Sequence, residues 1–456
     1  MNNCSFKEYL DIFGKQILMV CVGVICLSIV FWNLFPTYYS CCDASDYWKI
    51  SDDFSLMKNT YLGMRGFFYP LLIAVTRLVP NSLQLNLNLQ HISLSIVQLS
   101  LHIISTIALG YITYFLSKNK FITLCTLLIY GLDIFLIVFT NEILTDGVAV
   151  DFLVITTALL VGIVNRPDNK LLIIGFSFLA GLLPMIRPSL ILISITLYLI
   201  FIYLYIYKYN LRFLRSSVLL LGISFSFFLS PWAIQLIFSP LTFVLLSNLG
   251  KVHVVFGSYL YKYVTLLSPT PHGYAAVNEP MKQLVSVCNG LQEQINCINQ
   301  LLISHPILTF KHFITKLFAI NDQVYLVGYI NDFYNPFRYL WRGINCILLT
   351  SSLMGFMILI VKFVRNTERN ISQAILLMLI VASCLLPLIS SVPEERFGLT
   401  FHPLFVIFTS YFLDTYIQNK NSYSKRWKMI GFAIIFPLLL HFSFSIESTF
   451  SLSPNR

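Results

Sequence analysis

Long apolar runs separated by short polar segments follow one another along most of this sequence. A helix needs about 20 apolar residues to cross the hydrocarbon core of a membrane. Runs of that size predict about eleven transmembrane helices, over residues 16–35, 88–116, 121–140, 146–164, 171–186, 189–207, 217–238, 343–363, 371–391, 399–417 and 429–447. A further apolar run, 67–79, is too short to span and predicts a helix at the membrane surface.

Composition supports a membrane protein and excludes a soluble globular one. Only 11% of the 456 residues are charged and 57% are hydrophobic, whereas about 25% of a globular protein is charged. The net charge of +10 forms no basic stripe interleaved with aromatic residues, so no nucleic-acid partner is predicted. With the N-terminus in the cytoplasm, more than half of the 30 Lys and Arg lie in cytoplasmic segments, as the positive-inside rule expects, which supports this orientation.

Two long extracytoplasmic segments, 36–87 and 239–342, interrupt the pattern. We therefore expect an N-terminal transmembrane module over 1–238 that includes the first outer loop, a large and mostly helical outer loop over 239–342, and C-terminal transmembrane helices over 343–456. Cys288 and Cys297 share the second outer segment, and whether they form a disulfide stays open. No Cys or His spacing is typical of a metal site, so we predict no metal and no other cofactor.

Charged and aromatic residues gather in the first outer segment. Asp43, Asp46 and Tyr47 follow the first span, while Arg65 and Tyr69 lie at the start of the surface helix. A carboxylate here can take a proton from a hydroxyl, and aromatic rings can pack on a sugar face. The same residues also fit a solvated loop with the aromatic belt usual in membrane proteins.

Ionised side chains at the outer ends of the spans form a second group of candidates, because charges at membrane depth are costly and tend to be functional. Glu142 and Asp146 are four residues apart, which predicts one shared face at a helix start, and Arg187 is a candidate cation to balance them. Arg396, next to Glu395, opens the tenth span and suits a phosphate. Structural ion pairs and snorkelling are the alternative for both arginines.

Three further charged residues complete the candidates. Lys262 lies in the second outer segment, where it can meet an anionic headgroup or simply be a surface charge. Asp133 and Asp151 lie within apolar spans. Each either lines a cavity or, as we favour, bonds to a neighbouring helix.

Several of these segments resemble the integral-membrane glycosyltransferases of the C-type (GT-C) fold, in particular bacterial relatives of the protein O-mannosyltransferases and of the lipid A aminoarabinose transferase (family 39-like). Residues 43–47, Asp-Ala-Ser-Asp-Tyr, resemble the family's Asp-Glu-x-x-Tyr, and residues 65–70 resemble its Arg-x-x-x-Tyr-Pro. Arg187-Pro188 matches an Arg-Pro after the fifth span. Residues 230–235 are similar to its Pro-Trp-x-x-Arg-Asn, from which Gln235 departs, as Ala44 departs from the first motif.

The resemblance implies an all-α polytopic membrane protein with juxtamembrane helices in its first outer loop. It implies an inverting transfer of a sugar from a polyprenyl-phosphate donor to a lipopolysaccharide or other surface glycan, a glycolipid or a protein, at the outer face of the bacterial cytoplasmic membrane. Asp43 would be the general base, with Asp46 in reserve. The donor phosphate would be bound by Arg65, Arg187, Arg396 and Lys262, and the cavity would be lined by Tyr47, Tyr69, Glu142, Asp146 and Glu395.

Three other kinds of membrane protein remain as alternatives. A flippase or transporter of lipid-linked sugars would also use arginines for phosphate but would need no base. An O-antigen polymerase would take polyprenyl-diphosphate donors. A receptor or scaffold would carry out no transfer.

Overall fold

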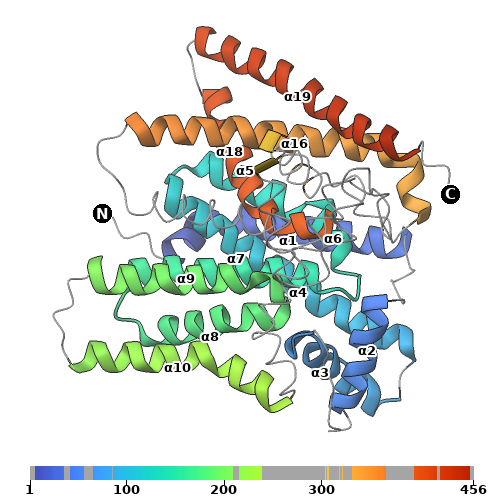
Figure 1. Ribbon diagram of the computed structural model, residues 1–456, viewed down its shortest axis with the longest axis vertical. Coiled ribbons are helices and arrows are strands. Elements are labelled where there is room, and N and C mark those ends of the chain that lie inside the picture. The colour runs from blue at the N-terminus through green and yellow to red at the C-terminus, as the bar shows by residue number, and fades with distance from the viewer. Residues whose placement is uncertain are drawn as a thin grey trace.

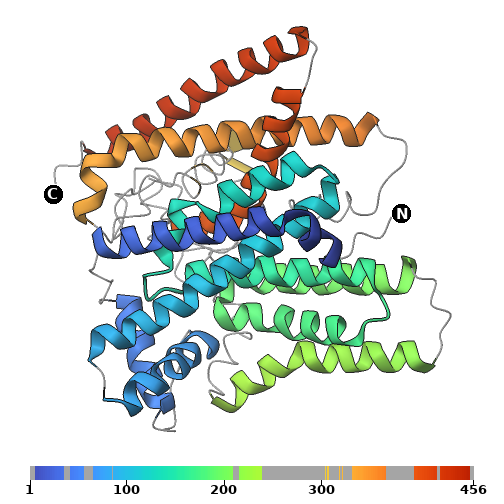
Figure 2. The ribbon, with the colours of Figure 1, turned by 180° about the vertical axis from the view of Figure 1, so that it is seen from behind.

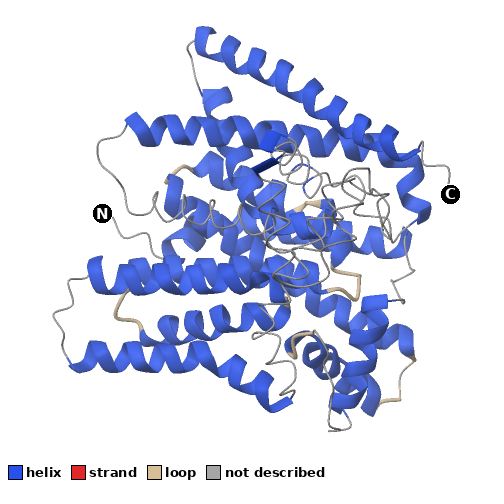
Figure 3. Ribbon diagram, viewed as in Figure 1, coloured by secondary structure: helices blue, strands red, loops and turns tan. Residues whose placement is uncertain are grey.

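The computed structural model describes residues 6–34, 42–55, 65–84, 86–208, 215–238, 303–304, 306–307, 318, 321, 331–365, 395–418 and 422–451, and for some of them, including Asp43, Glu395 and Arg396, the backbone alone. These residues form helices and short connections without a strand (Figure 3). The elements are α1 (Phe6–Leu34), α2 (Cys42–Ser55), α3 (Phe68–Ser82), α4 (Leu87–Ser117), α5 (Lys120–Gly131), α6 (Ile134–Phe139), α7 (Thr145–Asn165), α8 (Lys170–Ile186), η1 (Pro188–Leu190), α9 (Ile191–Tyr203), η2 (Leu204–Lys208), α10 (Arg215–Phe238), α16 (Asn331–Arg365), η4 (Glu395–Phe401), α18 (His402–Gln418) and α19 (Ser422–Ser451).

Six of the described helices are long and apolar enough to cross a membrane, within α1, α4, α7, α10, α16 and α19. Three shorter apolar helices cover 120–131, 170–186 and 191–206. This composition indicates a multi-pass membrane protein. The predicted span 371–391 lies outside the described residues, as do Cys288 and Cys297, so eleven spans and the three-part division of the chain remain predictions.

The prediction of one helix over 121–140 is wrong, because the helix is interrupted between α5 and α6. Asp133 lies between the two helices and is the N-cap residue of α6. Its Oδ1 accepts a hydrogen bond from the backbone N–H of Phe135 at 2.9 Å. Its Oδ2 lies 2.7 Å from Nδ1 of His402 on α18. An apolar run does not reveal such a break, since capping depends on one polar residue.

Asparagine caps explain why several neighbouring helices are joined by short turns. The side chain of Asn86 accepts from Leu89 N at the start of α4, that of Asn119 from Phe121 N at the start of α5, and that of Asn169 from Leu172 N at the start of α8. Each cap satisfies a backbone donor that the helix itself leaves open. The helices joined by these turns, α3 with α4, α4 with α5 and α7 with α8, also pack against each other.

Helices α4 and α7 pack together in the middle of the bundle (Figure 1). On one side lie α8, α9 and α10, and on the other lie α16, α18 and α19, an arrangement also visible from behind in Figure 2. The short helices α2 and α3 pack against each other at one end.

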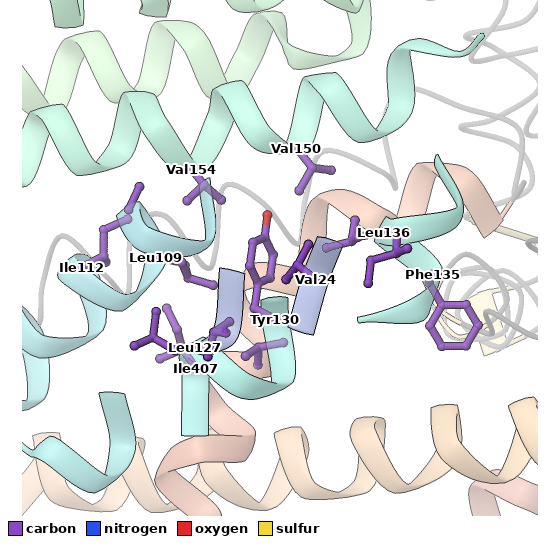
Figure 4. Packing of buried hydrophobic residues seen from close by; sticks show 14 of the residues in the cluster. Val24, Leu109, Ile112, Leu127, Tyr130, Phe135, Leu136, Val150, Val154 and Ile407 are labelled. Atoms are coloured by element: carbon purple, nitrogen blue, oxygen red, sulfur yellow. The ribbon is translucent and has the colours of Figure 1, made fainter. Parts of the chain in front are cut away.

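One large apolar cluster joins α1, α4, α5, α6, α7 and α18. Figure 4 shows part of it around Tyr130, which lies among Val24, Leu127 and Val150. A second cluster joins α2, α3, α7, α8, α9 and α10. The second cluster fixes α2 and α3 against the transmembrane helices, and the candidate site lies where these elements meet.

Candidate functional site

Helix α2 presents one buried face to α3 and an opposite polar face. Ala44, Tyr47 and Ser51 are buried and spaced three and four residues apart, which is one face of a helix. Asp46 lies on the other side, and its side chain is 57% exposed. The amphipathic pattern of α2 thus holds the helix in place and leaves a carboxylate accessible.

Arg65 lies in the short segment that precedes α3, and its side chain contacts the exposed face of α2. Its Nη2 donates to Oδ2 of Asp46 at 2.7 Å, and its Cζ lies 4.6 Å from the centre of the Tyr47 ring. The Tyr47 ring meets the Tyr69 ring edge-on, with 5.1 Å between centres. Four residues that the sequence predicted for the site, Asp46, Arg65, Tyr47 and Tyr69, are therefore linked in series by these three contacts.

Tyr69 is fully buried and links this group to the loop between α6 and α7. Its hydroxyl donates to Oε1 of Gln98 at 3.0 Å, and Nε2 of Gln98 donates to the carbonyl oxygens of Thr140 and Glu142, each at 3.1 Å. Burial raises the pKa of the Tyr69 hydroxyl well above its usual range, and the neighbouring acidic groups of Tyr47, Asp146 and Glu142 raise it further. Tyr69 therefore stays a neutral donor.

Arg187 and Asp146 form a buried ion pair between α8 and α7. Arg187 is the C-cap residue of α8. Its Nη1 donates to Oδ1 of Asp146, which lies in the first turn of α7. The pairing of Arg187 with this carboxylate agrees with the sequence prediction. Glu142 does not share the helical face of Asp146 as predicted, because α7 begins only at Thr145 and Glu142 lies in the preceding loop, where it is buried.

A close backbone contact joins the two segments that carry Arg65 and Arg187. A Cβ atom on Gly66 would lie 1.8 Å from the carbonyl oxygen of Met185, so only glycine fits beside the end of α8. Gly66 follows Arg65 directly, and Met185 precedes Arg187 by two residues. The connection that carries Arg65 therefore touches the turn that carries Arg187.

Gln235 of α10 contacts the same region, the corner formed by Arg65, Gly66, Met185 and Arg187. Its Oε1 accepts from the backbone N–H of Phe67 at 2.8 Å. Two buried polar atoms at this corner, Nε2 of Gln235 and Oδ2 of Asp146, have no hydrogen-bond partner within the described part of the chain. Such atoms are costly to bury, and a bound water or ion is one of the recognised reasons for them in native proteins.

Sequence reasoning missed Arg77, which binds α2, α3 and α4 together. Its Nε donates to Gln90 at 2.9 Å, its Nη1 donates to Ser51 at 2.8 Å and to Asp52 at 2.7 Å, and its guanidinium lies 4.1 Å from the centre of the Trp48 ring. A lone arginine in an otherwise apolar surface helix was the available signal. Gln98 was missed too, since an uncharged amide within a span gives little signal.

The remaining predicted site residues are placed only in part. Asp43 lies one turn before Asp46 on α2, and Glu395 and Arg396 lie in η4, whereas Lys262 falls outside the described residues. Element η4 packs against α7. In the part of the chain that the structure describes, no group of three or more His, Cys, Asp or Glu is placed to hold a metal ion.

The interior aspartates do bond to neighbouring helices, as the sequence predicted. Asp133 pairs with His402 as described above. Ser105 of α4 donates to Asp151 of α7, and Nδ1 of His102 lies 3.4 Å from the same carboxylate. Both carboxylates therefore contribute to helix packing rather than to the corner with the arginines.

The chain is similar in fold to the C-type membrane glycosyltransferases. The solved structures that it matches are of the oligosaccharyltransferase of Archaeoglobus fulgidus, the archaeal AglB. The apo form aligns with a TM-score of 0.54 at 10% identity, over 95% of this chain and 54% of that one. The complex with an inhibitory peptide and a dolichol-phosphate aligns with a TM-score of 0.50 at 11% identity, over 94% of this chain and 56% of that one.

A third structure, tethered to an acceptor peptide containing the NVT sequon, aligns with a TM-score of 0.50 at 9% identity, over 95% of this chain and 55% of that one. Identities this low show a shared fold, and the chain spans only about half the length of these enzymes. The chain matches no protein-family model and no curated protein sequence. The finer likeness to family 39-like transferases remains a prediction.

Proposed function

We propose that this chain is an inverting glycosyltransferase that moves a sugar from a polyprenyl-phosphate lipid to a hydroxyl of a surface glycan, glycolipid or protein, at the outer face of a bacterial cytoplasmic membrane. The observation that carries the proposal is the corner where Arg65–Asp46 and Arg187–Asp146 meet through Gly66 and Met185. The fold adds support, because one matched oligosaccharyltransferase structure contains a dolichol-phosphate, which is also a lipid phosphate.

On the donor side, the arginines bind and neutralise the phosphate. Arg65 and Arg187 are each held by a carboxylate, so their guanidinium groups are oriented before the lipid arrives. Fixed cations of this kind stabilise the charge that develops on a leaving phosphate without reorganising during the reaction. Arg396 and Lys262 complete the phosphate site in this proposal.

On the acceptor side, Asp43 is the proposed base and Asp46 the second candidate. The carboxylate takes the proton of the acceptor hydroxyl while that oxygen bonds to the anomeric carbon, from the face opposite the phosphate. The bond between the anomeric carbon and the phosphate oxygen breaks, and polyprenyl phosphate leaves. Because Asp46 already accepts from Arg65 and Asp43 lies one helical turn away, Asp43 is the first choice.

The sugar itself lies between these groups in the proposal. Oδ2 of Asp146 accepts from a sugar hydroxyl, and Nε2 of Gln235 donates to one, which gives both orphaned buried atoms a partner. The ring of Tyr47 lies on the sugar side in this proposal, the buried Tyr69 supports that ring edge-on, and Glu142 and Glu395 are assigned to the remaining wall. A site with fixed polar partners discriminates strongly against sugars that lack the matching hydroxyl.

The test uses the purified full chain in nanodiscs, with polyprenyl-phosphate sugars as donors and envelope glycans from a deletion strain as acceptors. Asp43→Asn should lower transfer by about 100-fold or more while donor binding persists. Asp53→Asn, on the same helix, is the matched control and should transfer at the normal rate.

Three outcomes would contradict the proposal. Lipid movement without any transfer would indicate a flippase. Transfer from diphosphate donors alone would indicate a polymerase. Full transfer by Asp43→Asn and by Asp46→Asn would exclude both carboxylates as the base.

A further inference from the structure

An apolar cleft of about 410 Å³ lies between α1, α4, α7 and α8, away from the candidate site. Its aliphatic walls are formed by side chains such as Ile104 and Ile107 of α4 and Ile155 and Leu159 of α7, and aromatic and polar side chains complete the lining. Apolar cavities of this kind do not hold ordered water, because water needs polar partners. The cleft is therefore suited to a hydrocarbon chain.

The cleft lies at the opposite end of the bundle from the arginine pairs. Asp146 is in the first turn of α7, whereas Asn165, the last residue of this 21-residue helix, lines the cleft. A helix of that length extends about 30 Å. Nδ2 of Asn165 donates to the hydroxyl of Tyr111 at 2.9 Å, which joins the ends of α7 and α4 beside the opening.

Cations outnumber the single carboxylate, Asp168, in and beside the turn between α7 and α8. Arg166 lines the cleft, its side chain is exposed, and it takes part in no ion pair among the described residues. Lys118 ends α4, Lys120 begins α5 and Lys170 begins α8, so three further cations lie at the same end. Basic pockets between transmembrane helices are a recurrent form of site for anionic lipid headgroups.

We propose that the cleft binds an anionic glycerophospholipid, with one acyl chain between α4 and α7 and the phosphate at Arg166. The two parts of such a lipid match the two parts of the site. Its hydrocarbon fits the aliphatic walls, and its headgroup meets the arginine at the opening. The assignment does not depend on the proposed transferase activity, because none of these residues belongs to the arginine corner.

The test uses the full chain in phosphatidylcholine nanodiscs. A trace of phosphatidylglycerol that carries a photoreactive acyl chain is the probe, and unlabelled phosphatidylglycerol is either present or absent. Labelling should map to α4, α7 and α8 around the cleft, and unlabelled phosphatidylglycerol should compete with it whereas phosphatidylcholine should not. Arg166→Gln should reduce labelling about fivefold, which corresponds to the loss of about 1 kcal/mol for one cation near an anionic lipid. Lys170→Gln removes a nearby cation that does not line the cleft and should have a smaller effect.

A second variant tests the acyl chain. Gly162 lines the cleft, and a Cβ there would meet no atom closer than the 3.4 Å contact with Leu172, so Gly162→Leu should fill the space and abolish labelling. Leu171→Phe is the control, because Leu171 is 81% exposed and lies outside the cleft. Labelling elsewhere, equal competition by phosphatidylcholine, competition by polyprenyl phosphate alone, or insensitivity to both Arg166→Gln and Gly162→Leu would overturn the proposal.

Discussion

The backbone N–H of Phe67 donates to Oε1 of Gln235 at 2.8 Å, although 168 residues separate them in the sequence. This bond ties the start of the surface helix α3 to the transmembrane helix α10. It occupies one end of the Gln235 amide and leaves Nε2 without a partner among the described residues. In the proposed function this side chain therefore combines a structural bond with a donor to the sugar.

Substitutions of Gln235 should separate these two roles. Gln235→Glu keeps an oxygen for Phe67 and replaces the free donor, so we expect reduced transfer through weaker sugar binding. Gln235→Met loses both and leaves the Phe67 N–H unpaired, which should cost about 1–3 kcal/mol of stability. Thermal unfolding in detergent and the KM for the lipid donor measure the two effects. Equal donor KM values for the wild type and Gln235→Glu would exclude a ligand role for Nε2.

Gly66→Ala should disrupt the contact between the α3 connection and α8. The added Cβ would lie 1.8 Å from the Met185 carbonyl oxygen, so the backbone must move apart. Overpacking of this kind typically costs about 1–3 kcal/mol, and it should also separate Arg65 from Arg187 and lower transfer. Gly14→Ala in α1, where nothing lies within 4 Å of the new Cβ, is the control. Similar unfolding temperatures for both variants would contradict the prediction.

Arg77→Lys should loosen α2 although it preserves the charge. A lysine ammonium cannot reproduce the bonds that the guanidinium makes to Gln90, Ser51 and Asp52 or its packing on Trp48. Faster hydrogen exchange of the α2 backbone should report the change. Asp52→Asn removes only a half-exposed partner, a pair of the kind usually worth about 0–1 kcal/mol, and should leave exchange nearly unchanged. Unchanged exchange in Arg77→Lys would show that the charge alone suffices.

Two substitutions of Asp133 should lower the stability of the protein by different amounts, because Asp133 caps α6 and also pairs with His402. Asn is a good N-cap, so Asp133→Asn should lose only the bond to His402, about 1.5–3 kcal/mol if charge-assisted. Asp133→Ala should lose about 1 kcal/mol more, for the cap. Thermal unfolding of the two variants in the same detergent gives the difference. A larger loss for Asn than for Ala would contradict the assignment.

The long helices could be predicted from the sequence because apolar length alone determines them. Candidate residues such as Arg65, Asp46 and Arg187 were found because charge at a membrane surface is conspicuous. The partners were harder to predict. Gln98 and Gln235 carry no charge, and Gly66 matters only because α8 ends beside it. The start of α7 was predicted to within one residue, but the placement of Glu142 in the preceding loop, where its carbonyl oxygen accepts from Gln98, was missed.

Helix α6 shows that hydropathy and lipid contact are different properties. Its residues Phe135 to Phe139 are all buried in the protein, so neighbouring side chains and not acyl chains solvate them. Substitutions there are constrained by the shapes of those neighbours rather than by the thickness of the bilayer. The number of apolar segments in such a chain can therefore exceed the number of times the backbone crosses from one aqueous phase to the other.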